Sequence, residues 1–362
     1  MATPDRPRIE SLDYLRGLLA LSVLVYHYST WVGLGWVWPL NGLISCLGIY
    51  AVSTFYILSG TSLAIVYGRQ VVDGAFLREF TIKRLLRITP LFWLASGASL
   101  MIPIVKWLAR GDASGLPAAS RLFWNFSLLF SWLKPEAYIA TGAWSIGNEL
   151  FFYTLFPLFI LFWNRSRWLF VGTVGVTLVF PLWAVFHMLD QRASLASQWV
   201  LYIQPLNQCF LFAGGIAIGL ARFRTPKIPT IVLWLVSLSS IGILASAPSG
   251  VDEIKYVTGA NRILFSAAAF AMCWVAANWN QRHNVILTTC MHFLGITSYS
   301  LYLLHPIVFG ICNSINFKTC HLPFVVMAFC VALPASLLAS RCSYTFIEKP
   351  AMNWAKRLCG KV

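Results

Sequence analysis

The chain has 362 residues, of which 58% are hydrophobic and only 11% are charged. Soluble globular domains are about 45 to 50% apolar and about 25% charged, so this composition excludes an ordinary soluble domain and indicates an integral membrane protein. In a soluble chain the formal net charge of +15 would suggest nucleic acid as a partner. In a membrane protein Lys and Arg accumulate in cytoplasmic loops, so we expect the lipid bilayer as a partner and no nucleic acid.

The nine cysteines include no CxxC spacing, so they indicate neither a zinc site nor a disulfide framework, and we expect no metal. The N-terminal segment MATPDRPRIE carries acidic residues and leads into an apolar stretch that contains Arg16. This is not the pattern of a cleaved signal peptide, so we expect the first helix to be retained.

The apolar stretches predict an all-α integral membrane protein with about ten transmembrane helices, forming a single domain over residues 1–362. The criterion is that a helix needs about 20 mainly apolar residues to cross the hydrocarbon core. The stretch 122–133 is shorter, and we expect a re-entrant or interfacial helix there. The predicted spans are 12–32, 43–67, 90–108, 145–163, 168–188, 201–221, 228–247, 261–279, 286–311 and 323–345.

The positions of the basic residues support this number of spans. If the N-terminus is cytoplasmic and 122–133 does not cross, the basic turns fall on the cytoplasmic side, as the positive-inside rule requires. A crossing at 122–133 would move every later basic turn to the outer side. We therefore expect ten spans with both termini cytoplasmic. The basic residues placed inside are Arg69, Arg78, Lys83, Arg84, Arg87, Arg165, Arg167, Arg222, Arg224, Lys227, Arg282 and the tail from Lys349 to Lys361.

Two ionisable residues of the first span, Arg16 and His27, are the first functional candidates, because such groups are costly inside a membrane. Eleven steps of about 100° put them nearly on one helix face, roughly 16 Å apart along the axis. This spacing predicts that they line two depths of one cavity. An Arg that reaches the cytoplasmic headgroups and a His at the outer interface fit the spacing equally well.

A second candidate is the pair Arg84 and Arg87, three residues apart on one face of the third predicted span. Two guanidiniums in this position suit the phosphates of a nucleotide-bearing donor. Topology alone also places basic residues at a cytoplasmic helix end, where they would contact anionic lipid.

A third candidate is Glu149, one turn inside the outer end of its span. Its carboxylate could pair with a His or Arg, or accept a hydrogen bond from a substrate hydroxyl. An acid that favours the positive end of the helix dipole is the alternative. For substrate contacts we expect Trp144, Asn148, Tyr299 and His305, although aromatic belts and helix–helix hydrogen bonds also place such residues in spans.

Six segments in order along the chain make it resemble the acyltransferase-3 family of multi-span membrane acyltransferases. Thr61 after the LSG sequence, where the family commonly has Phe, and Gly147-Asn148 before Glu149 depart from the family pattern. The matching segments are LDYLRG with the R-x10-H spacing of Arg16 and His27, FYILSG (55–60), KRLLRITPLFW (83–93), WSIGNELFFYTLFP (144–157), GITSYSLYLLHP (295–306) and FIEKP (346–350).

The resemblance implies a membrane O-acyltransferase of the bacterial inner membrane that uses acyl-CoA, usually acetyl-CoA, as donor. The acceptor is a hydroxyl of a cell-surface or exported glycan. Within the family pattern His27 corresponds to the essential catalytic histidine and Glu149 to a functionally important acid. The arginines Arg16, Arg84 and Arg87 correspond to donor-binding or structural positions.

Two mechanisms and two other functions stay open on the sequence alone. His27 acts either as a general base for direct transfer or as a covalent acyl carrier. In the first case Glu149 would orient the imidazole, as a carboxylate does in a Ser-His-Asp arrangement. A transporter or flippase for a lipid-linked saccharide also needs many spans and buried polar groups. A structural partner that has lost activity is the remaining alternative.

Overall fold

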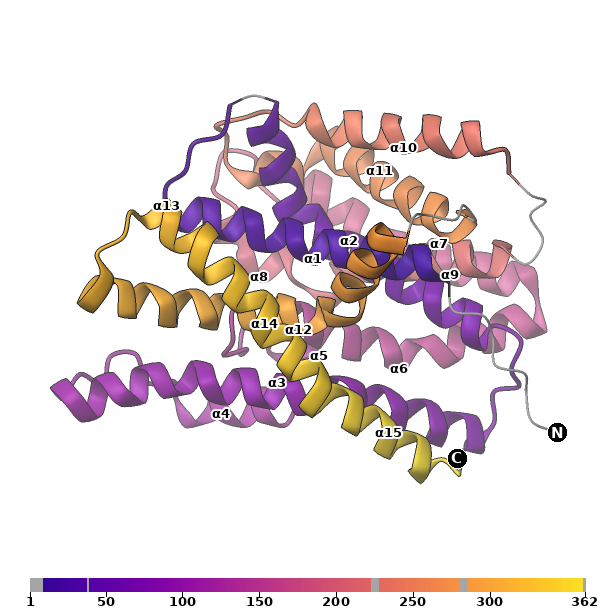
Figure 1. The fold of residues 1–362 in the computed structure, drawn as a ribbon. Helices are drawn as coiled ribbons and strands as arrows, with labels where there is room; N and C mark the ends of the chain where they lie inside the picture. Colours follow the sequence, from indigo (N-terminus) through magenta and orange to yellow (C-terminus); the bar gives the residue numbers. More distant parts are fainter. Residues whose placement is uncertain (1–8, 38, 223–227, 280–284, 361–362) are drawn as a thin grey trace.

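A computed structural model describes residues 9–37, 39–222, 228–279 and 285–360, and in these residues it contains helices and no strand. The predicted all-α class is therefore confirmed. Many of the long helices, such as α3, α6 and α10, run roughly horizontally in Figure 1, whereas α14 and α15 cross the bundle diagonally. Arg224, Lys227 and Arg282, which the sequence places on the cytoplasmic side, lie outside the described residues.

Eleven helices of ten or more residues form the bundle, and shorter helical segments connect or extend them in this described part. The long helices are α1 (Glu10–Trp31), α2 (Leu40–Tyr67), α3 (Gly74–Arg110), α6 (Ala143–Arg165), α7 (Arg167–Trp183), α9 (Pro205–Ala221), α10 (Thr230–Ala245), α11 (Gly259–Asn278), α12 (Val285–Ile315), α14 (Leu333–Ser343) and α15 (Lys349–Leu358). The shorter ones are α4 (Ala119–Phe126), α5 (Phe130–Leu133), η1 (Ala184–Met188), η2 (Ala196–Gln198), α8 (Trp199–Tyr202), η4 (Glu253–Tyr256), η5 (Asn316–Cys320), α13 (Phe324–Val326), η6 (Met327–Ala332) and η7 (Tyr344–Glu348).

All ten predicted spans coincide with helices, but not all of these helices have the length and composition of a span. Among the described helices seven are long and apolar enough to cross a membrane, or eight if the pair α8 and α9, bent by 56°, is one span. Of the helices at the ten predicted spans, two do not meet these criteria of length and composition. They are α1, which carries Glu10, Asp13 and Arg16, and α10, which has 16 residues. The structure therefore supports a multi-pass membrane protein with seven to eight clear spans.

The stretch 122–133 forms two short helices, α4 and α5, with eight and four residues. The chain turns between them at Leu128, which has a φ of 66°. Neither helix approaches the roughly 20 residues of a span, so the prediction of a short helical segment is confirmed. In Figure 1 α4 lies alongside α3, and the indole nitrogen of Trp93 on α3 donates to the carbonyl of Phe126 at 3.1 Å.

Glycines allow two pairs of helices to approach closely. On α9 an added Cβ at Gly215 would meet the Ile57 carbonyl of α2, and Thr61 of α2 donates a hydrogen bond to the Gly215 carbonyl at 3.0 Å. An added Cβ at Gly17 of α1 would lie 2.6 Å from Leu294 Cβ of α12. Small residues at such contacts let backbones approach and add van der Waals contact, which drives helix association in membranes.

The contact between α2 and α9 gives a test of this packing. Gly215→Ala should destabilise the protein by about 1 to 3 kcal/mol, because the new methyl group has to displace the α2 backbone. Thermal unfolding of the purified protein in detergent measures the effect. Gly172 on α7 has open space around it, so Gly172→Ala is the matched control and should cause no loss of stability. Equal melting temperatures for both variants would contradict the close contact.

Candidate functional site

Three adjoining cavities lie among α1, α2, α3, α6 and α12. The inner cavity has a volume of about 390 Å³ and is lined by Arg16, Arg84, Arg87 and Glu348 among others. The middle cavity, of about 100 Å³, shares the three arginines with it and adds Glu149. The outer chamber, of about 350 Å³, contains His27. The middle cavity and the outer chamber share Val52 and Tyr302, so the three form a series from the arginines to His27.

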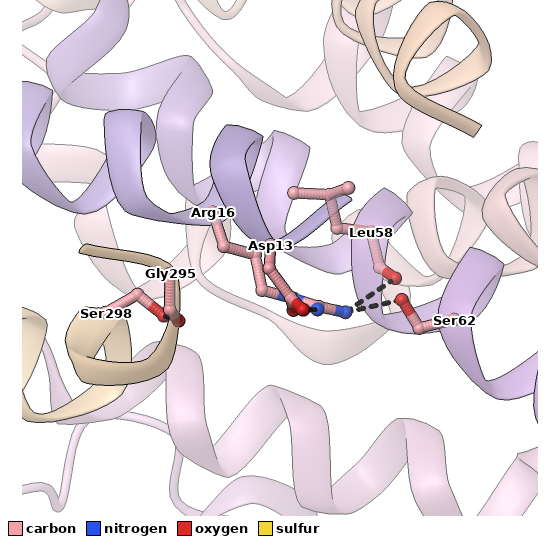
Figure 2. A network of polar contacts seen from close by, with 6 residues as sticks. All are labelled: Asp13, Arg16, Leu58, Ser62, Gly295 and Ser298. Atoms are coloured by element: carbon pink, nitrogen blue, oxygen red, sulfur yellow. Dashed lines mark hydrogen bonds and ion pairs between the residues drawn. The ribbon is translucent and has the colours of Figure 1, made fainter. Parts of the chain in front are cut away.

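Arg16 is held in place by groups on α1 and α2. Its guanidinium forms an ion pair with Asp13 at 2.7 Å, one turn earlier on α1. It also donates to the Leu58 carbonyl at 3.4 Å and to the Ser62 hydroxyl, both on α2. Figure 2 shows the side chain reaching from α1 across to these two residues. Arg16 therefore faces the interior of the bundle and links the two helices.

Arg84 and Arg87 line the inner cavity together with Arg16. In the described part of the chain no carboxylate lies within ion-pair distance of either guanidinium. The Arg84 guanidinium lies about 6 Å from the ring centres of Tyr67, Phe80 and Tyr153, and its buried Nε has no hydrogen-bond partner. These two cations therefore retain donors for an anionic ligand, which such arginine pairs bind well.

Three acids face the same two cavities. Asp13 pairs with Arg16, and Glu348 accepts a hydrogen bond from Ser300. Glu149 accepts a hydrogen bond from the Tyr153 hydroxyl at 3.1 Å. Glu149 thus lines the middle cavity with the arginines, and its hydrogen bond in the described residues comes from Tyr153 and not from His27.

His305 of α12 is the hydrogen-bond partner of His27. His27 Nδ1 and His305 Nε2 are 2.9 Å apart, and His305 Nδ1 lies 3.0 Å from the Leu301 carbonyl. A carbonyl only accepts hydrogen bonds, so His305 carries its proton on Nδ1 and offers Nε2 as an acceptor. His27 then donates from Nδ1. The neutral His27 imidazole is left with an unshared electron pair on Nε2, which is the arrangement of a general base.

Aromatic rings fix the His27 imidazole. Trp31, one turn later on α1, is stacked on it with ring centres 5.1 Å apart and planes inclined by 14°. His305 meets the imidazole at its edge, through the 2.9 Å hydrogen bond, with ring centres 5.1 Å apart and planes inclined by 21°. His305 itself is 1% exposed, and the Tyr28 hydroxyl donates to its carbonyl at 3.1 Å. An imidazole confined in this way keeps its orientation, and an aromatic face also stabilises an adjacent cation.

The outer chamber has aromatic walls and one carboxylate. Trp144 of α6 and Trp199 of α8 meet nearly at right angles, with ring centres 5.4 Å apart and an angle of 81°. Glu253 of η4 accepts a hydrogen bond from the Tyr26 hydroxyl at 2.9 Å. Flat apolar surfaces with a few polar groups are typical of sites for small ligands.

The structure separates the four residues expected to contact substrate. Trp144 lines the outer chamber, while Tyr299 lines the inner and middle cavities and donates to the Ile88 carbonyl at 2.8 Å. His305 contacts His27 instead of facing open space. The Asn148 amide is 1% exposed and donates to the Ile203 carbonyl at 3.0 Å and to the Tyr56 hydroxyl at 3.3 Å. Asn148 therefore connects α6 with α2 and with the segment before α9.

Sequence reasoning missed Trp31 and Glu253. Trp31 lies four residues after His27 on the same helix, a spacing that brings side chains together. The contact between these two rings could therefore have been predicted from the sequence. Glu253 lies outside the predicted spans, and nothing in its local sequence connects it with His27. The described residues contain no group of three or more His, Cys, Asp or Glu side chains that could hold a metal ion.

Comparisons with known proteins agree with the resemblance noted in the sequence. The family model of the acyltransferase-3 domain, described as an acyltransferase domain, matches residues 9–341. Similar curated proteins include those named O-acetyltransferase OatA from Staphylococcus aureus strains NCTC 8325 / PS 47 and COL. Each is 26% identical over 379 aligned residues, which cover 97% of this chain and 60% of the relative. The chain thus spans about 60% of the length of these relatives, and no solved structure matches it.

The hydrogen bonds of the histidine pair predict different chemical reactivity for its two members. Diethyl pyrocarbonate acylates unprotonated imidazole nitrogens, so it should modify His27 at its free Nε2 and leave His305 intact. Peptide mass spectrometry after brief treatment measures the two yields, with the exposed His187 as a control for the reagent. Replacing His27 by Ala should open His305 to modification. Faster modification of His305 than of His27 in the unaltered protein would overturn the assigned tautomers.

Proposed function

Because the chain belongs to the acyltransferase-3 family, we propose that it is a membrane O-acyltransferase. It transfers an acyl group, most simply acetyl, from acyl-CoA to a hydroxyl of a cell-surface or exported glycan. The observation that carries this proposal is the free Nε2 of His27 in a chamber that adjoins, through the middle cavity, the unpaired guanidiniums of Arg84 and Arg87.

The donor half of the proposal rests on the three arginines. The nucleotide of acyl-CoA carries several phosphates, and Arg84 and Arg87 offer unpaired guanidiniums for them. Arg16 lies in the same cavities, about 16 Å from His27 along α1 for eleven residues of helix. An extended pantetheine arm suits such a distance, so the phosphates can stay among the arginines while the thioester approaches His27.

His27 acts as the general base in the proposed transfer. Its Nε2 takes the proton of the acceptor hydroxyl as the hydroxyl oxygen attacks the thioester carbonyl carbon. The carbon–sulfur bond then breaks, and the CoA thiolate leaves and receives the proton. His305 accepts the hydrogen bond from Nδ1 throughout, which keeps Nε2 directed at the acceptor, and Trp31 stabilises the transient imidazolium. A covalent acyl group on His27 Nε2 is the second route.

We further propose that both termini and the arginine-lined end face the cytoplasm, in a bacterial inner (plasma) membrane. The start of α1 and the end of α15 lie at the same end of the bundle in Figure 1, which is also where α3 begins. Arg84 and Arg87 lie in the half of α3 nearer this end, about three to four turns after the helix begins at Gly74. Basic residues favour the cytoplasmic side, and acyl-CoA is a cytoplasmic metabolite, so one orientation satisfies both requirements.

The role of the histidine pair can be tested by substitution. His27→Ala should lower acetyl transfer by at least about 100-fold, the contribution expected from a general base. His305→Ala should also lower kcat, whereas His305→Gln should recover part of the loss because its carbonyl oxygen can accept the Nδ1 proton of His27. Release of CoA from acetyl-CoA by the purified protein in nanodiscs measures the rates, with His187→Ala as the control. Full activity of His27→Ala would disprove the assignment, and a transporter would not consume the thioester at all.

The role of the arginine pair needs a separate measurement. Removing both guanidiniums with Arg84→Ala and Arg87→Ala should raise the KM for acetyl-CoA by about 10-fold or more, since hydrogen bonds to charged groups contribute about 1.5 to 3 kcal/mol each. Lys83→Ala is the matched control, because Lys83 is adjacent but pairs with Glu79 at 2.6 Å. An unchanged KM in the double variant, with normal insertion into the membrane, would mean that the arginines serve topology alone.

A further inference from the structure

Glu253 is fixed at the wall of the outer chamber by contacts on both sides of its turn. The preceding residue, Asp252, accepts hydrogen bonds from the backbone of Ile254 at 2.9 Å and of Leu195 at 2.7 Å. These bonds join η4 to the segment before η2, which also lines the chamber through Leu195 and Ala196. Glu253 therefore extends from a braced turn, so its carboxylate has a defined position.

This carboxylate lines the same chamber as His27. It accepts a hydrogen bond at 2.9 Å from Tyr26, the residue before His27, and the Tyr26 and His27 rings have centres 5.3 Å apart. No Lys, Arg or His of the described residues lies within ion-pair distance of Glu253. One carboxylate oxygen bonds to Tyr26, and the other has no partner in the same part of the chain. A half-buried carboxylate with free acceptor capacity can bind hydroxyl groups strongly.

The rest of the chamber suits a ring that is apolar on its faces and polar at its edge. Trp144 and Trp199 form a corner of two perpendicular indoles. The Trp199 indole nitrogen is already used, because it donates to the Tyr138 hydroxyl at 2.9 Å. The Trp199 indole therefore offers a flat apolar surface, and among the polar side chains of the chamber His27 supplies an imidazole and Glu253 a carboxylate. A pyranose ring matches this division, since its C–H faces can stack while its hydroxyls point outward.

We propose that Glu253 is the residue that orients the acceptor, by accepting a hydrogen bond from the hydroxyl next to the one that His27 deprotonates. The inference rests on the proposed function and adds to it a requirement on the substrate. The acceptor presents two adjacent hydroxyls of one sugar ring, one toward His27 Nε2 and one toward the Glu253 carboxylate. Glu253 then determines which hydroxyl of the ring is acylated.

The experiment compares sugars that have or lack the neighbouring hydroxyl. The probes are methyl glycosides of the common hexoses and their monodeoxy analogues, used with acetyl-CoA and the protein in nanodiscs. With the unaltered protein, loss of one neighbouring hydroxyl should lower kcat/KM by about 10- to 100-fold, as expected for a hydrogen bond to a charged group. Mass spectrometry of the products identifies the acetylated position.

Glu253→Ala should remove this discrimination, so that the glycoside and its deoxy analogue differ by less than about 3-fold. The KM for the glycoside should rise more than kcat falls, a split that a general loss of structure would not produce. Glu253→Gln, which keeps an acceptor oxygen but loses the charge, should give an intermediate ratio. Lys255→Ala, an exposed change on the same turn, is the matched control and should retain the ratio of the unaltered protein.

Two further outcomes would overturn the inference. If Glu253→Ala keeps the full ratio, Glu253 does not contact the acceptor. If Tyr26→Phe, which leaves the carboxylate in place, removes discrimination as completely as Glu253→Ala does, the carboxylate only positions Tyr26.

Failure of the proposed function gives a different result from failure of this inference. If the protein hydrolyses acetyl-CoA in a His27-dependent manner but acetylates none of the glycosides, the sugar requirement is wrong and the donor half stands. If the unaltered protein consumes no acetyl-CoA and His27→Ala makes no difference, the proposed function itself fails.

Discussion

The close approach of α1 and α12 is the constraint on which the site depends. Gly17 and Gly295 allow it, since an added Cβ at Gly295 would lie 2.6 Å from the Asp13 carbonyl of α1. Toward the other end of the same contact, His27 of α1 reaches His305 of α12 at 2.9 Å. If the backbones were farther apart, His27 would lose the acceptor that fixes its tautomer. Packing in the apolar interior therefore determines the chemistry of the imidazole.

Buried polar groups in a membrane need hydrogen-bond or ion-pair partners. The polar residues along the series of three cavities differ in how completely they have such partners. Arg16 has an ion pair with Asp13 and two further contacts on α2, so it serves the fold as well as the cavity. His305 has both ring nitrogens engaged. Arg84 and Arg87 are different, because in the described residues no acid balances them at ion-pair distance. A ligand with phosphates would supply the missing partners, so the incomplete pairing is informative about the donor.

The structural features that depend on local periodicity could be predicted from the sequence. Apolar stretches of about 20 residues located the helices, and the 3.6-residue repeat put Arg16 and His27 toward one series of cavities. Contacts between distant segments could not be predicted. The pairing of His27 with His305 joins residues 278 positions apart, and Glu253 enters the chamber from a turn. The departures from the family pattern at Thr61 and Gly147 lie in helix contacts: Thr61 donates a hydrogen bond to the Gly215 carbonyl of α9, and Gly147 leaves room for Ser131 and Phe130 of α5.

The arrangement of the three cavities suits a path shared by two chemically different substrates. The inner cavity and the outer chamber, of about 390 and 350 Å³, are each much larger than the middle cavity of about 100 Å³ between them. The middle cavity overlaps the inner cavity at the three arginines and meets the outer chamber at Val52 and Tyr302. Tyr302 lies at the boundary, where its hydroxyl donates to the Gly142 carbonyl at 3.1 Å. In the proposed function, this arrangement places the donor phosphates among the arginines and the acceptor beside His27, so that the thioester would be the part of the donor that meets the acceptor.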